Sequence, residues 1–545
     1  MRAKRVRARS GWRSGLVVSL VFAVGLAFLL GGAGALAGPT PGGGHLKIAF
    51  GVGIDSLNPP LVNSLVGSGA MRHILEGLTR IGSDGTLEAE LAESWEVSED
   101  GLTWVFTLRQ DIKFHDGTEF NAAAVVANLD HVKDPVQNYS RKGHIKNITS
   151  YEATGPYQVA MHLSERTGDL PSRFVYHAYV MLSPKALAEL GPSGIARNPV
   201  GTGPFKIEDY RPEDGILTVV RNEDYWRGPP KLERITWISI KEEGARVAAL
   251  EAGEVDVALP VSAKFQPTID AAPGLAFKIS GGGRLVRMGI NANIIALSDV
   301  RVREALTLAI DREGFIDAFM PGIARVPISM ITDANWGTIS AYDYRYDPDR
   351  ARELMAEAGW SQDGNGRWVD CAGASFPALN FISYRGRTIG DAEVPQAIAA
   401  QLDEFGFVIN HQELEFNTAT AKSREDVNRT RDADIHLFWG SSGSVWLDAS
   451  ANLDGFDARY NNVNWRYLLY YAGTSWWPDM DIVKTSGDPE IRGPALARIQ
   501  EAIAADHAAI PLYEIELTAG MSTELNGWWV APNEVWWFAD SWFEG

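Results

Sequence analysis

The chain contains very little cysteine. Cys371 is the single cysteine among 545 residues, so no disulfide can form within one chain. No cysteine follows the N-terminal segment either, and the lipid attachment that anchors many exported proteins therefore lacks its acceptor residue. Stability has to come from buried apolar cores, and a chain of this length can form more than one.

Motifs of metal and catalytic chemistry are missing as well. The chain has no HExxH or CxxC, and its ten His residues are scattered, so coordination of a metal by several side chains is not expected. No serine lies in a GxSxG elbow. The glycine run 281–283 precedes a predicted strand and not a helix, and we interpret it as a loop without a phosphate-binding role. We expect no cofactor and no enzymatic activity; an exported hydrolase stays open as an alternative.

Basic residues are outnumbered. The chain has 50 Lys and Arg against 69 Asp and Glu, which gives a net charge of −19. Six of the basic residues and no acidic residue lie in residues 1–37, so the chain without this segment carries six charges less, or −25. Binding to nucleic acid needs clustered Lys and Arg, and anionic lipid surfaces also attract basic residues. Neither partner is expected.

Long apolar runs are absent outside the N-terminus. The run 16–30 is interrupted only by Ser19, follows the basic region, and is followed by the small residues Ala35 and Ala37. The run is shorter than the roughly 20 residues of a membrane span. We predict a secretory signal peptide at 1–37 and a linker at 38–45, which places the mature chain in the periplasm or another extracytoplasmic space. An uncleaved anchor is the alternative.

The remaining chain shows a regular alternation of strand and helix patterns. Period-two alternation predicts early strands at 46–50, 95–97 and 103–108. Helical spacing predicts helices at 122–132, 245–251 and 300–319. The last third continues the alternation, with helices at 348–358, 392–405 and 489–506 and strands at 376–384, 407–415 and 433–438. This order is typical of an α/β protein with more than one lobe.

The stretch 198–205 controls the backbone and holds no reactive group. Pro199 and Pro204 fix φ, while Gly201 and Gly203 permit conformations that other residues avoid. A rigid turn of this kind, followed by the alternating run that begins at Phe205, predicts a crossover into a sheet.

Together with Arg221-Asn222-Glu223-Asp224-Tyr225-Trp226, this stretch resembles a signature of the extracytoplasmic solute-binding proteins of ABC importers, in the peptide/nickel class (family 5). Further segments resemble the same family in the same order. They cover most of residues 46–510 and lie at 91–95, 114–118, 249–256, 299–306, 309–312, 346–348 and 356–360.

The resemblance implies a two-lobed periplasmic-binding-protein fold of the class II type. Lobe I is expected to be discontinuous and lobe II to be continuous, with an extra subdomain on lobe I. The expected ranges are 46–85, 203–292 and 511–545 for lobe I, 86–202 for the subdomain and 293–510 for lobe II. Members of the family enclose their ligand between the lobes by closing at a hinge, and a membrane permease recognises the closed form. The resemblance also implies a monomer that changes no bond in its ligand.

In peptide-binding members of the family, a Trp followed closely by an Asp anchors the amino group of the ligand. The matching stretch here begins at Trp439, and Ser441 stands where that Asp is expected. A hydroxyl cannot neutralise a buried ammonium group. Asp448 is the candidate substitute, and Trp446 is a second candidate for stacking on the ligand.

Candidate cationic side chains lie outside this stretch. Arg141, Arg385 and Arg387 are suited to bidentate contacts with ligand carboxylates. His144 is a further candidate, because it lies near Arg141 where the subdomain is expected to face the cleft. Solvated surface positions are the alternative for all three arginines.

The favoured ligand is a small peptide or an amino-acid-derived solute. The missing Asp keeps a chelated metal open, and the 18 tryptophans keep an oligosaccharide open. A role as the ligand-loaded partner of a membrane sensor is a further alternative to transport. The C-terminal tryptophans are interpreted as packing: Trp528, Trp529, Trp536, Trp537 and Trp542.

Overall fold

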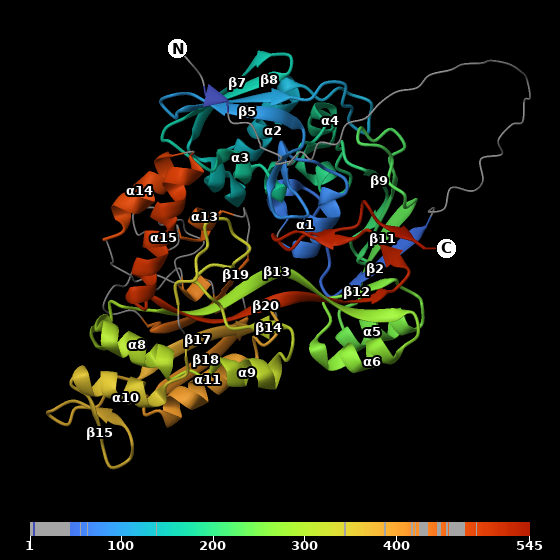
Figure 1. Cartoon of the computed structure of the whole chain (residues 1–545). Helices are drawn as coiled ribbons and strands as arrows, with labels where there is room; N and C mark the ends of the chain where they lie inside the picture. The colour runs from blue at the N-terminus through green and yellow to red at the C-terminus, as the bar shows by residue number, and fades with distance from the viewer. Residues whose placement is uncertain are drawn as a thin grey trace, which may run out of the picture.

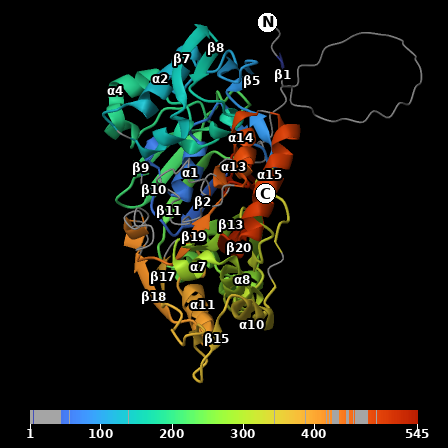
Figure 2. The same cartoon turned by 90° about the vertical axis from the view of Figure 1, so that its left-hand side faces the viewer.

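The computed structural model has two lobes joined by two long strands, and an added subdomain on the first lobe (Figure 1). It describes residues 4–5 and 44–544, apart from residues 55, 63, 138, 343–344, 386–387, 416–417, 420, 424–433, 444–447, 454–455, 457–474 and 487. Within this part of the chain, no helix combines the length and the apolar character needed to cross a bilayer. Figure 2 shows the subdomain at one end of the molecule and the strands β17 and β18 with helix α10 toward the other.

Within the described residues, one sheet of eleven strands passes through both lobes. Its order is β18-β17-β19-β13-β20-β12-β2-β11-β10-β9, with β14 paired to β20. The first-lobe strands are β2 (His45–Phe50), β9 (Phe205–Arg211), β10 (Ile216–Arg221), β11 (Arg234–Ser239) and β12 (Val257–Leu259). The second-lobe strands are β14 (Ala324–Arg325), β17 (Leu379–Arg385), β18 (Ile409–Glu415) and β19 (Leu437–Ser442).

Strands β13 (Leu275–Ile290) and β20 (Ala509–Ser522) connect the lobes (Figure 1). They pair antiparallel over nearly their whole length, and the register breaks between Ser280 and Arg284. The glycine run 281–283 lies at this break, inside β13. The interpretation of the run as a loop before a strand was therefore wrong. Its partner strand begins more than 200 residues later, and periodicity does not reveal such a pairing.

Gly283 is expected to be far less tolerant of a side chain than Gly281. A Cβ on Gly283 would lie 2.2 Å from Oε1 of Glu514, whose carboxylate is fixed by Arg325 at 2.9 Å. A Cβ on Gly281 would meet no atom of the described residues within 4 Å. We expect Gly283→Ala to lower the free energy of unfolding by about 1–3 kcal/mol, and Gly281→Ala to leave it unchanged or raise it by up to about 1 kcal/mol. Urea denaturation of both variants checks this, and equal stabilities would contradict it.

The first lobe packs helices and the C-terminal segment around the strands of its half of the sheet. Its core includes Ile48, Ile74, Phe205 and Trp237, all buried. The helices and short strands of this lobe are η1 (Pro59–Leu61), α1 (Leu65–Arg72), α5 (Glu243–Glu251), η4 (Ala263–Phe265), α6 (Gln266–Ala271), β21 (Leu525–Asn526), β22 (Trp529–Val530), β23 (Trp536–Trp537) and β24 (Trp542–Phe543).

The motif residues of the stretches 198–205 and 221–226 meet around one buried carboxylate, Glu76. Its oxygens accept hydrogen bonds from the Thr202 hydroxyl at 2.7 Å, the Tyr225 hydroxyl at 2.8 Å and the Trp226 indole at 2.8 Å. Burial and then the charge of Glu90 raise the pKa of Glu76 to about 7. The signature thus builds the scaffold of the first lobe.

The subdomain contains a smaller sheet of order β1-β5-β6-β8-β7. Its strands are β1 (Lys4–Arg5), β5 (Ala92–Val97), β6 (Thr103–Leu108), β7 (Ile148–Gly155) and β8 (Gln158–Leu163); β3 (Thr79–Ile81) and β4 (Leu87–Ala89) form a separate pair. Its helices are α2 (Ala122–Lys133), η2 (Ser140–Ile145), α3 (Leu170–Arg173), η3 (His177–Tyr179) and α4 (Pro184–Ile195). Phe106, Phe120 and Leu129 belong to its core, whereas Ala186 and Ile195 of α4 pack in the core of the first lobe. The predicted hairpin and the helix that begins at Ala122 are confirmed.

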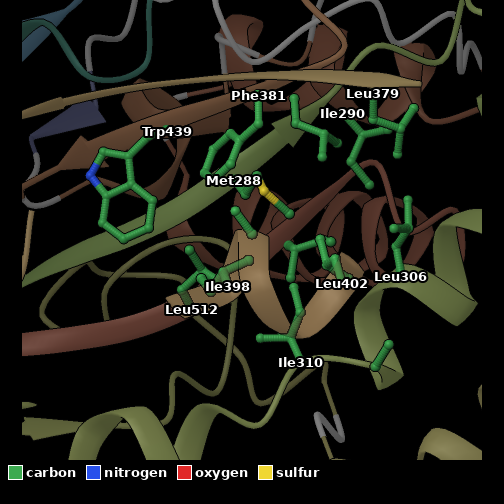
Figure 3. Packing of buried hydrophobic residues seen from close by; sticks show 14 of the residues in the cluster. Met288, Ile290, Leu306, Ile310, Leu379, Phe381, Ile398, Leu402, Trp439 and Leu512 are labelled. Atoms are coloured by element: carbon green, nitrogen blue, oxygen red, sulfur yellow. The ribbon is translucent and has the colours of Figure 1, made fainter. Parts of the chain in front are cut away.

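In the second lobe, helices pack on the strands around a large apolar core. Figure 3 shows part of this core, including Met288, Phe381, Ile398 and Leu512. Its elements are α7 (Ile295–Ser298), α8 (Val300–Leu308), α9 (Arg312–Phe319), α10 (Pro348–Glu357), β15 (Ser361–Gln362), β16 (Trp368–Val369), α11 (Glu393–Glu404), α13 (Ala449–Leu453), α14 (Trp477–Thr485) and α15 (Pro489–Ala505).

The helix predicted at 300–319 is two helices, α8 and α9. Asp311 accepts a hydrogen bond from the Gly314 amide at 2.9 Å and caps the start of α9. The apolar spacing continues through the interruption, so periodicity alone could not show it.

Candidate ligand-binding site

A cavity of about 860 Å³ lies between the subdomain and the second lobe. One wall contains residues from the β3–β4 pair, from the hairpin β5–β6 and from the segment 166–172, and the second-lobe wall includes Trp336, Asp448 and Arg492. The helices α14 and α15 stand beside the subdomain in Figure 1. The two walls touch, because a Cβ on Gly168 would lie only 1.8 Å from the Ser486 carbonyl oxygen.

The walls of this interlobe cavity combine aromatic and charged side chains. Trp95 and Trp104 come from the hairpin β5–β6, and Trp336 stands opposite them on the second lobe. The guanidinium of Arg492 lies 5.1 Å from the Trp336 ring, within reach of a cation–π contact. Burial alone would raise the pKa of Asp169, but Arg173 and, across the cavity, Arg492 and Lys484 hold it below its usual value.

Asp448, which the sequence predicts to bind the ligand, lines the interlobe cavity, but its carboxylate is already paired with other residues of the protein. Its two oxygens lie 2.9 and 3.0 Å from the Arg492 guanidinium. One of them also accepts hydrogen bonds from the Ser450 amide at 3.0 Å and the Ser450 hydroxyl at 2.6 Å. Both members of the pair are buried, so Asp448 contributes a fixed, neutralised charge to the cavity wall.

Trp439 and Ser441 lie side by side on β19 and belong to the interior. The Trp439 indole donates to Asp391 at 3.2 Å, and the Ser441 hydroxyl lies 3.1 Å from the Tyr384 hydroxyl. Neither residue lines the interlobe cavity. Their position at the end of β19 places them directly before Gly443, which contacts Glu534.

The other predicted residues are spread over the molecule. Arg385 is exposed at the end of β17 and forms an ion pair with Glu413 at 3.3 Å. His144 packs against Tyr176 with 5.6 Å between ring centroids, inside the subdomain. Neither residue lines the interlobe cavity. Trp446, Arg387 and the side chain of Arg141 lie outside the described part of the structure.

A second, smaller cavity of about 110 Å³ lies in the first lobe beside the break in β13. Glu534 lines it and forms a buried ion pair with Arg284, the first paired residue of β13 after the break. A Cβ on Gly443 would lie 2.8 Å from Oε2 of Glu534. This carboxylate therefore lies against β13, one of the two strands that join the lobes, and beside the residue that follows β19. We call the cavity the Glu534 cavity.

No local pattern in the sequence marks Arg284 or Glu534, which lie 250 residues apart. Glu534 belongs to the tryptophan-rich C-terminal segment, whose aromatic composition predicts packing and does not indicate a buried carboxylate. Arg284 follows the glycine run 281–283, which is the one nearby feature that marks the region. No group of three or more His, Cys, Asp or Glu residues suited to a metal ion occurs among the described residues.

Glu514 makes the stability of the protein dependent on pH. It lies next to Arg325, Asp333 and Glu516, and its burial raises its pKa to about 7. A carboxyl group with a raised pKa in the folded state binds a proton there that the unfolded chain has already lost, so the free energy of unfolding falls as pH rises from about 4.5 to 7.

We expect the Glu514→Gln variant to lose this dependence. Between pH 5 and pH 8 its free energy of unfolding should fall by about 2–3 kcal/mol less than that of the wild type. Urea denaturation at these two pH values measures the difference, and Glu524→Gln, at an exposed position, is the control. Equal slopes for Glu514→Gln and wild type would contradict the assignment.

Comparisons with known proteins agree with this architecture. A family model described as bacterial extracellular solute-binding proteins, family 5 Middle, matches residues 86–464. The glutathione-binding protein GsiB of Escherichia coli (strain K12) is 28% identical over 543 residues, covering 98% of this chain and 99% of GsiB. GsiB of Salmonella typhimurium is 27% identical over 502 residues, covering 91% and 93%.

Solved structures share the fold. HbpA2 from Haemophilus parasuis has a TM-score of 0.79 at 21% identity, covering 92% of this chain and 100% of that chain. CtaP from Listeria monocytogenes has a TM-score of 0.78 at 20% identity, covering 92% and 99%. These likenesses confirm the two-lobed α/β fold predicted from the sequence. Because the family model spans more than half of the chain, the resemblance is confirmed as well: the protein belongs to the bacterial extracellular solute-binding proteins of family 5.

Proposed function

We propose that the protein is the substrate-binding component of an ABC importer, and that it captures a small peptide or amino-acid-derived solute between its lobes. The observation that supports this is the interlobe cavity of about 860 Å³, with walls from both the subdomain and the second lobe. Cavities of roughly 300–1,000 Å³ suit small-molecule ligands. A solute that touches both walls favours the closed arrangement, and a membrane permease can recognise that arrangement.

The chemistry of the walls fits a zwitterionic solute. Arg166 and Asp169 on the subdomain, and Asp448 with Arg492 on the second lobe, place charges of both signs around the cavity. Trp95, Trp104 and Trp336 add flat apolar surface. The curated relatives are named for glutathione, a peptide derivative with one ammonium and two carboxylate groups, and it is the first compound to test.

Further parts of the proposal concern location and partners. The segment 1–37 directs export, and the mature chain acts in the periplasm or another extracytoplasmic space as a monomer. Its protein partner is the permease, and nucleic acid plays no part. The solute leaves unchanged, so the protein is not an enzyme.

Native mass spectrometry of the gently purified mature chain is the deciding experiment. The expected result is a bound mass of a peptide or amino-acid derivative, which the free compound then reproduces in a tryptophan-fluorescence titration without being converted. Glutathione is titrated in parallel. A hexose-spaced mass would favour an oligosaccharide, for which the three cavity tryptophans are the supporting observation, and a metal-bearing mass would favour a chelate. A product of changed mass after incubation would contradict the binding role.

A further inference from the structure

The Glu534 cavity contains buried oxygen atoms without partners. Oε2 of Glu534 binds Arg284, whereas Oε1 is buried and has no hydrogen-bond partner in the described structure. Thr518 lines the same cavity, and its hydroxyl oxygen is also buried without a hydrogen-bond partner in the described structure. The Glu534 side chain is only 2% exposed. Buried polar atoms are nearly always hydrogen-bonded, so two such atoms at one small cavity indicate a missing donor.

The remaining wall of the cavity is aromatic and aliphatic. Trp237, Trp536 and Phe538 line it together with Glu534. Aromatic faces attract cations, and several aromatic rings around one acidic group form the type of site that recognises alkylammonium groups. The volume of about 110 Å³ exceeds the roughly 30 Å³ of a single water molecule, and it accommodates an ammonium group with a short alkyl stem.

The neighbouring histidine does not supply a competing positive charge. His73 packs against the rings of Trp237 and Phe538. Its Nδ1 lies 2.9 Å from the Gly69 carbonyl oxygen, and its Nε2 accepts from the Phe538 amide at 3.0 Å. These bonds fix the neutral form of the ring, and burial lowers its pKa to about 4. Among the described residues, Arg284 is the cation that binds Glu534.

The Glu534 cavity lies close to the junction of the two lobes. Glu534 belongs to the first lobe, Arg284 lies on β13, which continues into the second lobe, and Gly443 directly follows the second-lobe strand β19. The pair Glu534–Arg284 therefore joins the C-terminal segment of the first lobe to β13.

We propose that the Glu534 cavity binds the alkylammonium group of the solute, with Glu534 and Thr518 as its hydrogen-bond acceptors and the rings of Trp237 and Trp536 around its stem. This assignment rests on the proposed function, since it names the chemical class of the captured solute: a primary amine. It also makes Glu534 a residue that determines specificity.

The first test uses a minimal probe, n-propylammonium, with neutral 1-propanol as its matched control in saturation-transfer NMR titrations of the mature chain. We expect saturable binding of n-propylammonium that is at least about tenfold tighter than that of 1-propanol, because the hydrogen bond to Glu534 is charge-assisted. Glu534→Gln should abolish this preference, and Thr518→Val should weaken n-propylammonium binding several-fold. Glu524→Gln, an exposed carboxylate of the same C-terminal segment, should bind like the wild type.

Circular dichroism and thermal unfolding report whether each variant folds. If Glu534→Gln fails to fold because Arg284 loses its partner, Thr518→Val decides, since it leaves that ion pair intact. Equal binding of n-propylammonium and 1-propanol, or unchanged amine binding in folded Glu534→Gln or Thr518→Val, would overturn the assignment and leave ordered water in the cavity.

A second titration separates this inference from the proposed function. It uses the compound found by mass spectrometry and its N-acetylated form, with glutathione and N-acetylglutathione if the chain is purified empty. Binding that is equal in wild type and Glu534→Gln, and insensitive to acetylation, would preserve the proposed function and overturn the ammonium site. Failure of every peptide or amino-acid derivative to bind would overturn the proposed function, while the n-propylammonium titration still decides the chemistry of the cavity.

Discussion

Replacing Asp448 with alanine is expected to lower the free energy of unfolding by about 3–5 kcal/mol. Asp448 and Arg492 form a two-contact ion pair with 8% and 6% of their side chains exposed, respectively. Removal of the carboxylate leaves the guanidinium buried without its counter-charge, and it removes the acceptor of the Ser450 amide and hydroxyl. The cost of a broken buried pair is dominated by the charge left behind.

Urea denaturation of Asp448→Ala measures this loss, and Asp349→Ala is its control. Asp349 pairs with Arg352 on helix α10, and 92% of the Asp349 side chain and 48% of the Arg352 side chain are exposed. Exposed pairs contribute about 0–1 kcal/mol, so the control should remain close to the wild type. If Asp448→Ala lowers the free energy of unfolding by less than about 1 kcal/mol, water or another group must neutralise Arg492 in the variant. The ion pair would then contribute little to the stability of the cavity wall.

Most of the secondary structure was predictable because it depends on local patterns. The strand at 46–50, the hairpin at 95–108 and the helix at 348–358 are present with ends that differ by at most three residues. The stretch 198–205 was also interpreted correctly as a rigid turn into a strand, since Phe205 begins β9. These features depend on side-chain periodicity and on the backbone preferences of Pro and Gly.

The lobe junction was beyond prediction from patterns, since it depends on strands far apart in the sequence. Gly283 is tightly packed because Glu514 of β20 lies against it, and Arg284 is buried because Glu534 pairs with it. Asp448 is the first carboxylate after Trp439 along the sequence, and it is neutralised by Arg492. The carboxylate that lies beside Gly443 in space is Glu534.

Replacing Gly168 with alanine is expected to weaken solute binding by about 10- to 100-fold while the protein stays folded. Gly168 touches the second lobe through its backbone: a Cβ would lie 1.8 Å from the Ser486 carbonyl oxygen and 2.8 Å from its carbonyl carbon. Because these are backbone atoms at the end of α14, no side-chain rotation relieves the clash. The subdomain and the helices α14 and α15 have separate cores, so the clash opens the interlobe cavity and leaves both cores intact.

The measurement combines a tryptophan-fluorescence titration with small-angle scattering of Gly168→Ala, using the compound identified by mass spectrometry or glutathione. We expect a larger radius of gyration than in the liganded wild type and a thermal midpoint within a few degrees of it. Gly155→Ala is the control, because its Cβ would meet only the Gln158 Cβ, at 3.9 Å, within the subdomain. Unchanged affinity and radius in Gly168→Ala would show that the contact with Ser486 is dispensable for the ligand-bound form. The solute would then be held mainly beside the strands β13 and β20, where the lobes join, and closure against the subdomain would contribute little to its affinity.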